Sequence, residues 1–371
     1  MSTRQSTRSV LRGICCLGLW SLSGLTHPAA VPRRWTVLTA PAVLTQTSAR
    51  AARAEPREPR SYEEVIAESG LEDWSVKDYE AMRDDVPRTS KFEKAIQRRL
   101  QKQPQATVLD IGTGPFALLA VLAAKAGAKK VYAIEKNPEA AALAKETVER
   151  DGWKDVIEVI EGDSMQVTLP EQVDLVVSEL IGSIATQEGV EPIIRDARQR
   201  FLKESEGACG MIPARCQTCI VPVLYKGRSF LQRVTAPFEG VRSRGKPQAG
   251  SSTPLRIKSA DEGNLEFLSE PQVLEDFDYC AAANSPKKLT STLEFPVAQE
   301  GTFSGFAMWT RVVVDDQEVI EVRGQPDSHW AYVVAVMTRY PQSVEPGTIK
   351  LVSEIDYDAS PVSYSFKAEV P

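Results

Sequence analysis

Glu179 and Glu188 are the pair of residues whose types and spacing most suggest chemistry. Glu179 ends a β-branched run at residues 173–179, and Glu188 follows nine residues later. Two carboxylates without a metal suit a guanidinium. This group is planar, stays charged because its pKa lies above about 12, and presents five donors in a fixed fork. One carboxylate can bind it through two hydrogen bonds while the other aligns its second edge, which leaves one terminal nitrogen more nucleophilic. A pair of solvated loop acids is the competing interpretation.

His329 is a further candidate for chemistry. It lies on a loop before a predicted strand, next to Trp330, and the other histidine of the chain falls in the N-terminal leader described below. A carboxylate partner such as Asp85 could fix the tautomer of His329 or exchange a proton with it. The competing interpretation is a packed histidine without a chemical role.

A glycine-rich turn follows the β-branched run at residues 106–111. Gly112 and Gly114 let the backbone turn tightly and approach a ligand at the start of the next helix. Dinucleotide sites share this pattern. However, Asp110 would face a pyrophosphate unfavourably and suits the ammonium of a methionine moiety, and Pro115 removes an N–H from the turn. The turn therefore favours S-adenosylmethionine over NAD.

Polar residues also follow the next two runs, at 131–135 and 156–161. Glu135 ends the first run, where a carboxylate can accept hydrogen bonds from both ribose hydroxyls of either cofactor. Asp163 and Ser164 follow the second run, where an adenine would lie. A lone solvated acid remains the alternative for Glu135. The order of strand, glycine turn, helix and acid-ended strand favours an adenosine cofactor, whose sulfonium methyl the guanidinium nitrogen could attack.

Residues 104–208 predict the framework that positions these side chains. An Ala-rich helical stretch at 116–126 and a second at 137–151, which begins with Asn-Pro, separate the β-branched runs, and each stops at a glycine. Repeated strand–helix units at this spacing predict a parallel sheet with helices on both faces.

The pattern changes after residue 209. Runs with strand character recur with turn residues between them, which predicts an antiparallel barrel or sandwich over 209–371. Within it, residues 235–264 are rich in Gly, Pro, Ser, Arg and Lys and predict a long mobile loop or projecting arm. The predicted strands lie at 217–224, 303–314, 332–339, 348–357 and 362–370.

Residues 1–54 predict a targeting leader. They contain seven Arg and thirteen Ser or Thr but no Lys, Asp or Glu. An uncharged apolar stretch at 13–25 follows three arginines, the order of a secretory signal, and the basic remainder is typical of an organelle transit peptide. Together they predict a bipartite leader for a plastid (chloroplast), with a mitochondrial presequence or a disordered tail as alternatives. The sequence contains no apolar run of 18 or more residues, so we predict no membrane span in the mature chain.

Charge and cysteine content narrow the function classes. Without its leader the chain keeps 37 basic and 50 acidic residues, and the formal net charge changes from −6 to −13. This charge disfavours direct nucleic-acid binding and favours basic partners. Two His and a single C-x-x-C pair, Cys216 and Cys219, predict no metal site. We interpret the pair as strand cysteines without a redox role.

These motifs together resemble the protein arginine N-methyltransferase family, from about residue 76 to the C-terminus. YEAMRDDVPRT resembles the helix that closes over the cofactor, in which Arg88 would meet the methionine carboxylate and Met82 would lie beside the methyl donor. VLDIGTG and YAIE resemble the glycine motif and the ribose-binding acid. SELIGSIATQE resembles the double-glutamate loop, and SHW resembles the threonine-histidine-tryptophan loop whose histidine pairs with the helix aspartate, here Asp85.

The resemblance implies an α/β Rossmann-type class I methyltransferase domain at 104–208, preceded by helices at 61–103 and followed by an antiparallel β-barrel substrate domain at 209–371. The segment 235–264 falls near the family's dimerisation arm, so a homodimer is possible. The implied reaction is S-adenosylmethionine-dependent methylation of arginine in a basic protein substrate. Its catalytic residues would be Glu179, Glu188, His329 and Asp85.

Three alternatives stay open. The chain could methylate another protein or a small molecule, could be a non-catalytic scaffold that keeps the fold, or could be an NAD oxidoreductase. The departures from the family pattern bear on this choice. Pro115 replaces the usual third small residue of the glycine motif, and Ser328 replaces Thr. Val190 stands where many members have Met. Leu180 and Ile181 replace Trp-Met, and the paired tyrosines of the preceding helix are missing, with Trp74 the nearest aromatic residue.

Overall fold

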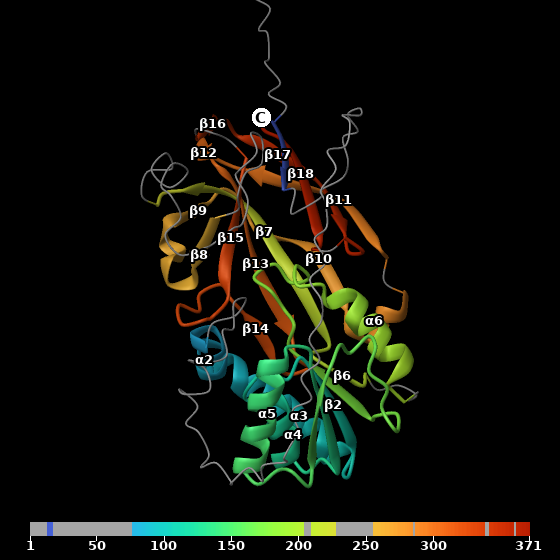
Figure 1. Ribbon diagram of the computed structural model, residues 1–371. Coiled ribbons are helices and arrows are strands. Elements are labelled where there is room, and N and C mark those ends of the chain that lie inside the picture. The colour runs from blue at the N-terminus through green and yellow to red at the C-terminus, as the bar shows by residue number, and fades with distance from the viewer. Residues whose placement is uncertain are drawn as a thin grey trace, which may run out of the picture. The chain divides into compact units, whose positions relative to one another are not determined.

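The computed structural model describes residues 13–17, 76–203, 209–227, 255–284, 286–337, 341–359 and 361–371, all within one compact unit. Figure 1 shows that these residues form a sheet flanked by helices and a larger set of strands. The rest of the predicted leader over 1–54, and the first part of the predicted helical region 61–103, lie outside the described residues.

A parallel sheet forms the first part. Its order is β4-β3-β2-β5-β6, and every neighbouring pair runs parallel. All residues of β2 and β5 are buried, as expected for parallel strands that are covered on both faces. The strands are β2 (Thr107–Ile111), β3 (Lys130–Glu135), β4 (Ile157–Glu161), β5 (Leu175–Ser178) and β6 (Met211–Ile212).

Three helices follow strands of this sheet. They are α4 (Leu118–Lys125), α5 (Pro138–Arg150) and α6 (Val190–Arg200). The start of α5 is as predicted, because the Asn137 side chain accepts a hydrogen bond from the Ala140 N–H at 3.0 Å and Pro138 occupies the first turn. The sequence did not predict α6, which begins after Gly189 (φ 77°) without a side-chain cap.

Two helices precede the sheet, α2 (Val76–Asp84) and α3 (Val86–Lys102). They meet at Asp85, whose carboxylate accepts a hydrogen bond from the Arg88 N–H at 3.0 Å and so caps α3. One face of α3 is buried through Phe92, Ile96 and Leu100, which recur every four residues. The cap fixes where the chain turns from α2 into α3, and both Asp85 and Arg88 are thereby placed at that corner.

Antiparallel strands form the second part. Among the described residues, a seven-stranded sheet has the order β10-β7-β13-β15-β8, with β14 beside β13 and β9 beside β7. A four-stranded sheet has the order β1-β18-β17-β11, and β12 pairs with β16. The strands are β1 (Gly13–Leu17), β7 (Arg215–Tyr225), β8 (Leu255–Lys258), β9 (Leu265–Phe267), β10 (Gln272–Asp278), β11 (Lys288–Val297), β12 (Gly301–Phe303), β13 (Gly305–Val313), β14 (Val319–Glu321), β15 (Ala331–Val336), β16 (Gln342–Val344), β17 (Gly347–Asp356) and β18 (Ser363–Glu369), with the 3-10 helices η1 (Ser259–Asn264) and η2 (Tyr279–Asn284).

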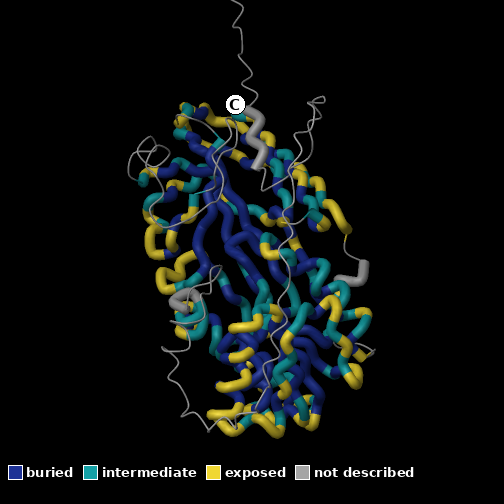
Figure 2. Tube along the Cα trace, in the orientation of Figure 1, coloured by how far each residue is buried: buried dark blue, intermediate teal, exposed yellow. Residues whose placement is uncertain are grey.

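Apolar side chains join the two parts. Figure 2 shows the central strands β7, β13 and β15 buried along most of their length. One buried cluster includes Val176 and Ile212 of the parallel sheet together with Trp309 and Tyr332 of the seven-stranded sheet. Because burial of apolar surface contributes about 25 cal/mol per Å², this shared core holds the antiparallel strands against the parallel sheet.

Two predicted boundaries change. Residues 255–264 fall inside the predicted loop or arm, yet they form β8, which pairs with β15, and η1. Their apolar residues Leu255 and Ile257 are buried in part or in full, which a projecting loop would not allow. The domain boundary predicted at 209 also moves, because Met211–Ile212 still pairs with β5 of the parallel sheet. Within the leader, Gly13–Leu17 pairs with β18, and the targeting prediction stays a prediction.

Besides Cys15 and Cys16 on β1, four cysteines lie among the described residues. Cys216 and Cys219 on β7 are buried free thiols, and burial raises the pKa of Cys219 to about 11. Cys209 and Cys280 form a disulfide across 71 residues, which the sequence analysis did not predict. It connects the chain before β6 to η2 beyond β10. In the same described residues no helix is long and apolar enough to cross a membrane, and no side chains cluster as metal ligands.

We predict that dithiothreitol lowers the melting temperature of the full chain by about 5–10 °C. Closing a loop of this length restricts the unfolded chain by about 4 kcal/mol. The measurement is thermal unfolding with and without reductant, with the double variant Cys209→Ser/Cys280→Ser as the control. The variant should melt at the temperature at which the wild type melts in dithiothreitol, and dithiothreitol should not change the melting temperature of the variant. An unchanged melting temperature of the reduced wild type would contradict the prediction.

Candidate active site

The loop from Glu179 to Glu188 connects β5 to α6, and the barrel holds its backbone. The Ile181 carbonyl accepts a hydrogen bond from the Trp330 indole N–H at 2.8 Å. The next carbonyl, that of Gly182, accepts one from the Thr310 hydroxyl on β13 at 2.5 Å. The path of the loop between the two glutamates is therefore set by the second domain and not by the sheet from which the loop departs.

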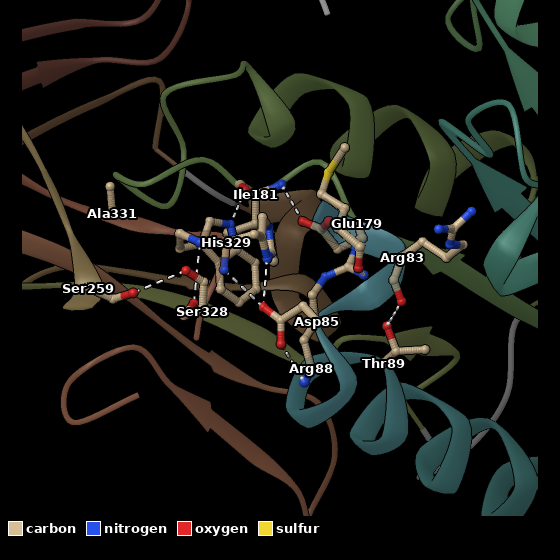
Figure 3. Close-up of polar contacts among 12 residues, drawn as sticks. Arg83, Asp85, Arg88, Thr89, Glu179, Ile181, Ser259, Ser328, His329 and Ala331 are labelled. Atoms are coloured by element: carbon tan, nitrogen blue, oxygen red, sulfur yellow. Dashed lines mark hydrogen bonds and ion pairs between the residues drawn. The ribbon is translucent and has the colours of Figure 1, made fainter. Parts of the chain in front are cut away.

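Glu179 already holds a guanidinium. The Arg88 side chain forms an ion pair with Glu179 Oε2, and both side chains are almost fully buried. Glu179 Oε1 accepts a hydrogen bond from the Ile181 N–H at 3.1 Å, and Arg88 also donates to the Met82 carbonyl at 3.2 Å. Figure 3 shows Arg88 reaching from its helix to Glu179. The sequence predicts a methionine carboxylate as the partner of Arg88, whereas in the structure Arg88 pairs with Glu179, a residue predicted to bind the substrate.

Glu188 lies at the other end of the loop and is an exposed residue. The protein near its carboxyl desolvates that group, and the negative charge of Glu179 acts on it. Both effects raise the pKa of Glu188 to about 7, and the nearby Arg256 opposes them in part. The two glutamates are therefore close enough to interact, and Glu188 changes its charge near neutral pH.

His329 and Asp85 meet as predicted. Asp85 Oδ2 lies 2.8 Å from His329 Nδ1 and also accepts a hydrogen bond from the His329 N–H at 3.1 Å. Burial alone would raise the pKa of Asp85, but the hydrogen bonds from His329 and Arg88 outweigh it and lower that pKa. Figure 3 shows Asp85 between His329 and the start of α3. With Nδ1 engaged, Nε2 is the ring nitrogen left for a substrate or a proton.

The glycine turn has the conformation that its residues predict. Gly112 and Gly114 have φ of 74° and 64°, and a Cβ on Gly112 would lie 2.5 Å from Leu180. Asp110 accepts hydrogen bonds through Oδ2 from the Thr113 hydroxyl and the Ala120 N–H, at 2.6 and 3.0 Å. Its Oδ1 is buried and has no hydrogen-bond partner among the described residues. Desolvation raises the pKa of Asp110 to about 7.

The predicted ribose and adenine residues lie at the ends of neighbouring strands. Glu135 accepts hydrogen bonds from the Gly114 N–H (2.9 Å) and the Asn137 N–H (2.8 Å), one on each oxygen. Asp163 pairs with Lys136 at 2.9 Å, and that hydrogen bond holds the pKa of Asp163 below its ordinary value. Ser164 is buried beside it. Glu135 therefore braces the turn, and each of its oxygens keeps a further lone pair for a hydroxyl.

These residues fit S-adenosylmethionine. The unpartnered oxygen of Asp110 can accept from an ammonium, and a turn without a Cβ at Gly112 or Gly114 allows a ligand to approach the backbone. Met82 is partly buried on α2, where Tyr79 also approaches Gly114. When bound, the cofactor would supply an electrophilic methyl group, and the residues of the site would bind and orient the group that accepts it.

Several residues that hold the site were missed by the sequence analysis. Thr310, Thr218, Glu275 and Arg256 lie on strands of the barrel and contact the double-glutamate loop through hydrogen bonds or charge. None belongs to a motif, and the strands β8 and β10 were not predicted. No local signal marks Glu275, because the buried residues of β10 do not alternate regularly with exposed ones.

The sequence is similar to those of known proteins. The family model described as PRMT5 arginine-N-methyltransferase matches residues 68–209. Protein arginine N-methyltransferase PRMT10 of Arabidopsis thaliana is 28% identical over 275 residues, which cover 65% of this chain and 70% of the relative. The arginine N(omega)-methyltransferase of Streptomyces achromogenes subsp. streptozoticus is 32% identical over 260 residues, 67% of this chain and 68% of the relative.

The fold has a close counterpart among solved structures. The Trypanosoma brucei PRMT1 enzyme-prozyme heterotetrameric complex with AdoHcy contains a chain that superposes with a TM-score of 0.63 at 20% identity. The match covers 79% of this chain and 93% of that one, so it spans both the parallel sheet and the barrel. Together with the sequence matches, it establishes that this chain is a member of the arginine N-methyltransferase family, whose cofactor is S-adenosylmethionine.

Proposed function

We propose that the protein transfers the methyl group of S-adenosylmethionine to a guanidinium nitrogen of arginine in basic protein substrates. The observation that carries the proposal is the ion pair between Glu179 and the Arg88 guanidinium, beside a second carboxylate, Glu188. Glu179 is thus a carboxylate that accepts a guanidinium in this fold. Glu188 adds a second acceptor at the same place, as a planar group with two donor edges requires.

The reaction then uses the charges of the site. Glu179 and Glu188 hold the substrate guanidinium and draw its positive charge away from one terminal nitrogen, which forms the new bond to carbon. Bound S-adenosylmethionine would supply the methyl group and leave as a neutral thioether, and the attacking nitrogen would lose one proton. Glu188 has a pKa of about 7, suited to accept this proton, and His329 with Asp85 supports the pair or relays the proton to solvent.

The chain's residues also suggest how the cofactor is held. Asp110 would accept from the ammonium, Glu135 from the ribose hydroxyls, and Asp163 and Ser164 would border the adenine. Arg88 would pair with the methionine carboxylate, in the place where Glu179 now provides its counter-charge. Met82 would lie beside the methyl donor.

Partners and location are part of the same proposal. A mature charge of −13 favours basic, arginine-containing segments over nucleic acids. Assembly as a homodimer is supported by the position of the segment 235–264, which falls near the place where family members carry a dimerisation arm, although residues 255–264 form β8 and η1. The solved structure with a similar fold is named as a heterotetrameric complex. The leader composition supports plastid import, with the mitochondrion as the alternative.

Free arginine is a second candidate acceptor. The relative from Streptomyces achromogenes is named for arginine itself and not for protein arginine. The two glutamates would bind the same guanidinium in either case, so only a comparison of acceptors separates the candidates.

We predict that the full chain, given methyl-labelled S-adenosylmethionine, labels arginine in an Arg- and Gly-rich protein more readily than free arginine. Glu179→Gln should lower the rate about a hundredfold, because it removes a charged hydrogen-bond partner of the reacting group. Hydrolysed products separated as methylated amino acids give both the rate and the methylation state. The exposed Glu294→Gln on β11 is the control. Cofactor binding without labelled arginine on any acceptor would favour the scaffold alternative.

We predict that kcat/KM for the protein acceptor rises between pH 6 and pH 8, with a midpoint near 7. The raised pKa of Glu188 leaves it protonated and neutral below about pH 7, where it cannot hold a guanidinium. Glu188→Gln should be slow and nearly independent of pH. Cofactor affinity is measured over the same range, because Asp110 also titrates near pH 7. A flat wild-type profile at saturating cofactor would contradict this assignment.

We predict that Asp85→Asn lowers methylation about tenfold and changes the melting temperature little. Asparagine caps a helix as well as aspartate does, so α3 keeps its start, whereas His329 loses its charged partner. Asp85→Ala removes both functions and should also destabilise the chain by about 1–2 kcal/mol. Equal loss of stability in both variants would show that the His329 contact is structural.

A further inference from the structure

Glu275 is a buried carboxylate in the interior of the barrel that the proposed reaction does not use. It lies on β10 and is 1% exposed. Its Oε1 accepts a hydrogen bond from the Thr218 hydroxyl at 2.6 Å, and its Oε2 accepts from the Thr186 hydroxyl at 2.7 Å and the Tyr357 hydroxyl at 3.2 Å. A buried charge without such donors would be costly, so the surrounding hydroxyls account for its presence.

Two of these contacts lead directly into the double-glutamate loop. The Thr186 N–H donates to Glu275 Oε1 at 3.4 Å, in addition to the bond from its hydroxyl. The Ala185 N–H donates to the Thr218 hydroxyl at 2.9 Å, which in turn donates to Glu275. Two consecutive N–H groups of the loop thus end, directly or through one hydroxyl, on the same carboxylate.

Glu188 lies in the turn that these bonds fix. The Gly189 N–H donates to the Thr186 carbonyl at 3.0 Å and closes a turn of four residues, in which Glu188 is the third. Among the described residues the Glu188 side chain forms no hydrogen bond or ion pair, so the position of its carboxyl follows from the backbone of the turn. A displacement of Thr186 would move Glu188 relative to Glu179.

We propose that Glu275 is a positioning residue for Glu188: it holds the Thr186 end of the double-glutamate loop, and thereby sets the spacing of the two carboxylates that bind the substrate guanidinium. The proposal rests on the proposed function. A purely hydrophobic residue could fill the same volume at less cost in desolvation. What it could not supply is acceptors for the N–H and hydroxyl groups of an irregular loop.

The test compares four variants of the full chain. Thr186→Val removes the hydroxyl that bonds Glu275 and keeps the shape, whereas Thr186→Ser keeps the hydroxyl. Glu275→Gln keeps the shape but replaces one acceptor oxygen by a donor. Tyr357→Phe removes a bond to Glu275 that does not touch the loop, so it is the matched control.

Four quantities are measured for each variant: amide hydrogen exchange of residues 180–189, the dissociation constant of S-adenosylhomocysteine, and kcat and KM on the Arg- and Gly-rich protein. Thr186→Val and Glu275→Gln should speed exchange and lower kcat/KM about tenfold, the effect of one lost buried hydrogen bond. Thr186→Ser and Tyr357→Phe should stay within about threefold of wild type in both. Cofactor affinity should stay within about twofold throughout.

Several results would overturn the proposal. They are unchanged exchange in Thr186→Val, equal loss in Thr186→Ser and Thr186→Val, or a parallel loss of cofactor affinity that signals general damage. Should Glu275→Gln not fold, the two Thr186 variants decide. If the wild type methylates no arginine, the proposed function fails on its own, and the exchange rates alone still show whether Glu275 holds the loop.

Discussion

The hydrogen bonds from the barrel to the double-glutamate loop are the constraint on which the site depends. Two carboxylates that face one substrate repel each other, and the loop between them has no helix or strand to resist that repulsion. Side chains from three separate parts of the barrel bind backbone groups of residues 181, 182 and 185 of this loop, namely Trp330, Thr310 and Thr218. The loop is thereby held from the outside, and the shared apolar core keeps the barrel in register with the sheet.

The same arrangement explains why departures from the family pattern are compatible with the site. Ile181 contributes its carbonyl to Trp330 and its N–H to Glu179, so these contacts do not depend on its side chain. Leu180 packs against Gly112, at a distance that excludes a Cβ there. Ser328 accepts a hydrogen bond from the Trp330 N–H through the hydroxyl that a threonine would also offer. Backbone and hydroxyl contacts therefore preserve the site where side chains differ.

The features that could be predicted from the sequence are those that depend on neighbouring residues in the chain. Caps such as Asn137, the glycine turn at Gly112 and the acids at strand ends have short-range signals, and the structure places these elements within a few residues of the prediction. The residues alone named Asp85 only as an example of a carboxylate partner for His329, and the family resemblance then specified the pairing, because no local pattern links residues 244 positions apart.

Long-range contacts account for what was missed. Strands β8 and β10 have short or charged segments whose character is decided by their neighbours in the sheet. Glu275 reads as a surface acid until β10 is placed in the barrel interior. The disulfide of Cys209 with Cys280 likewise depends on the docking of the two domains, which neither segment encodes locally.

The ion pair between Arg88 and Glu179 makes an internal residue a competitor of the substrate. An incoming guanidinium must share Glu179 with Arg88 or displace it, and displacement leaves a nearly buried cation without its counter-charge. An anion that binds Arg88 removes that penalty and so frees Glu179. Since linkage is reciprocal, arginine bound at Glu179 raises the affinity of Arg88 for the anion by the same factor. With the proposed roles of Arg88 at the methionine carboxylate and Glu179 at the acceptor, cofactor and acceptor would be coupled thermodynamically through a single side chain.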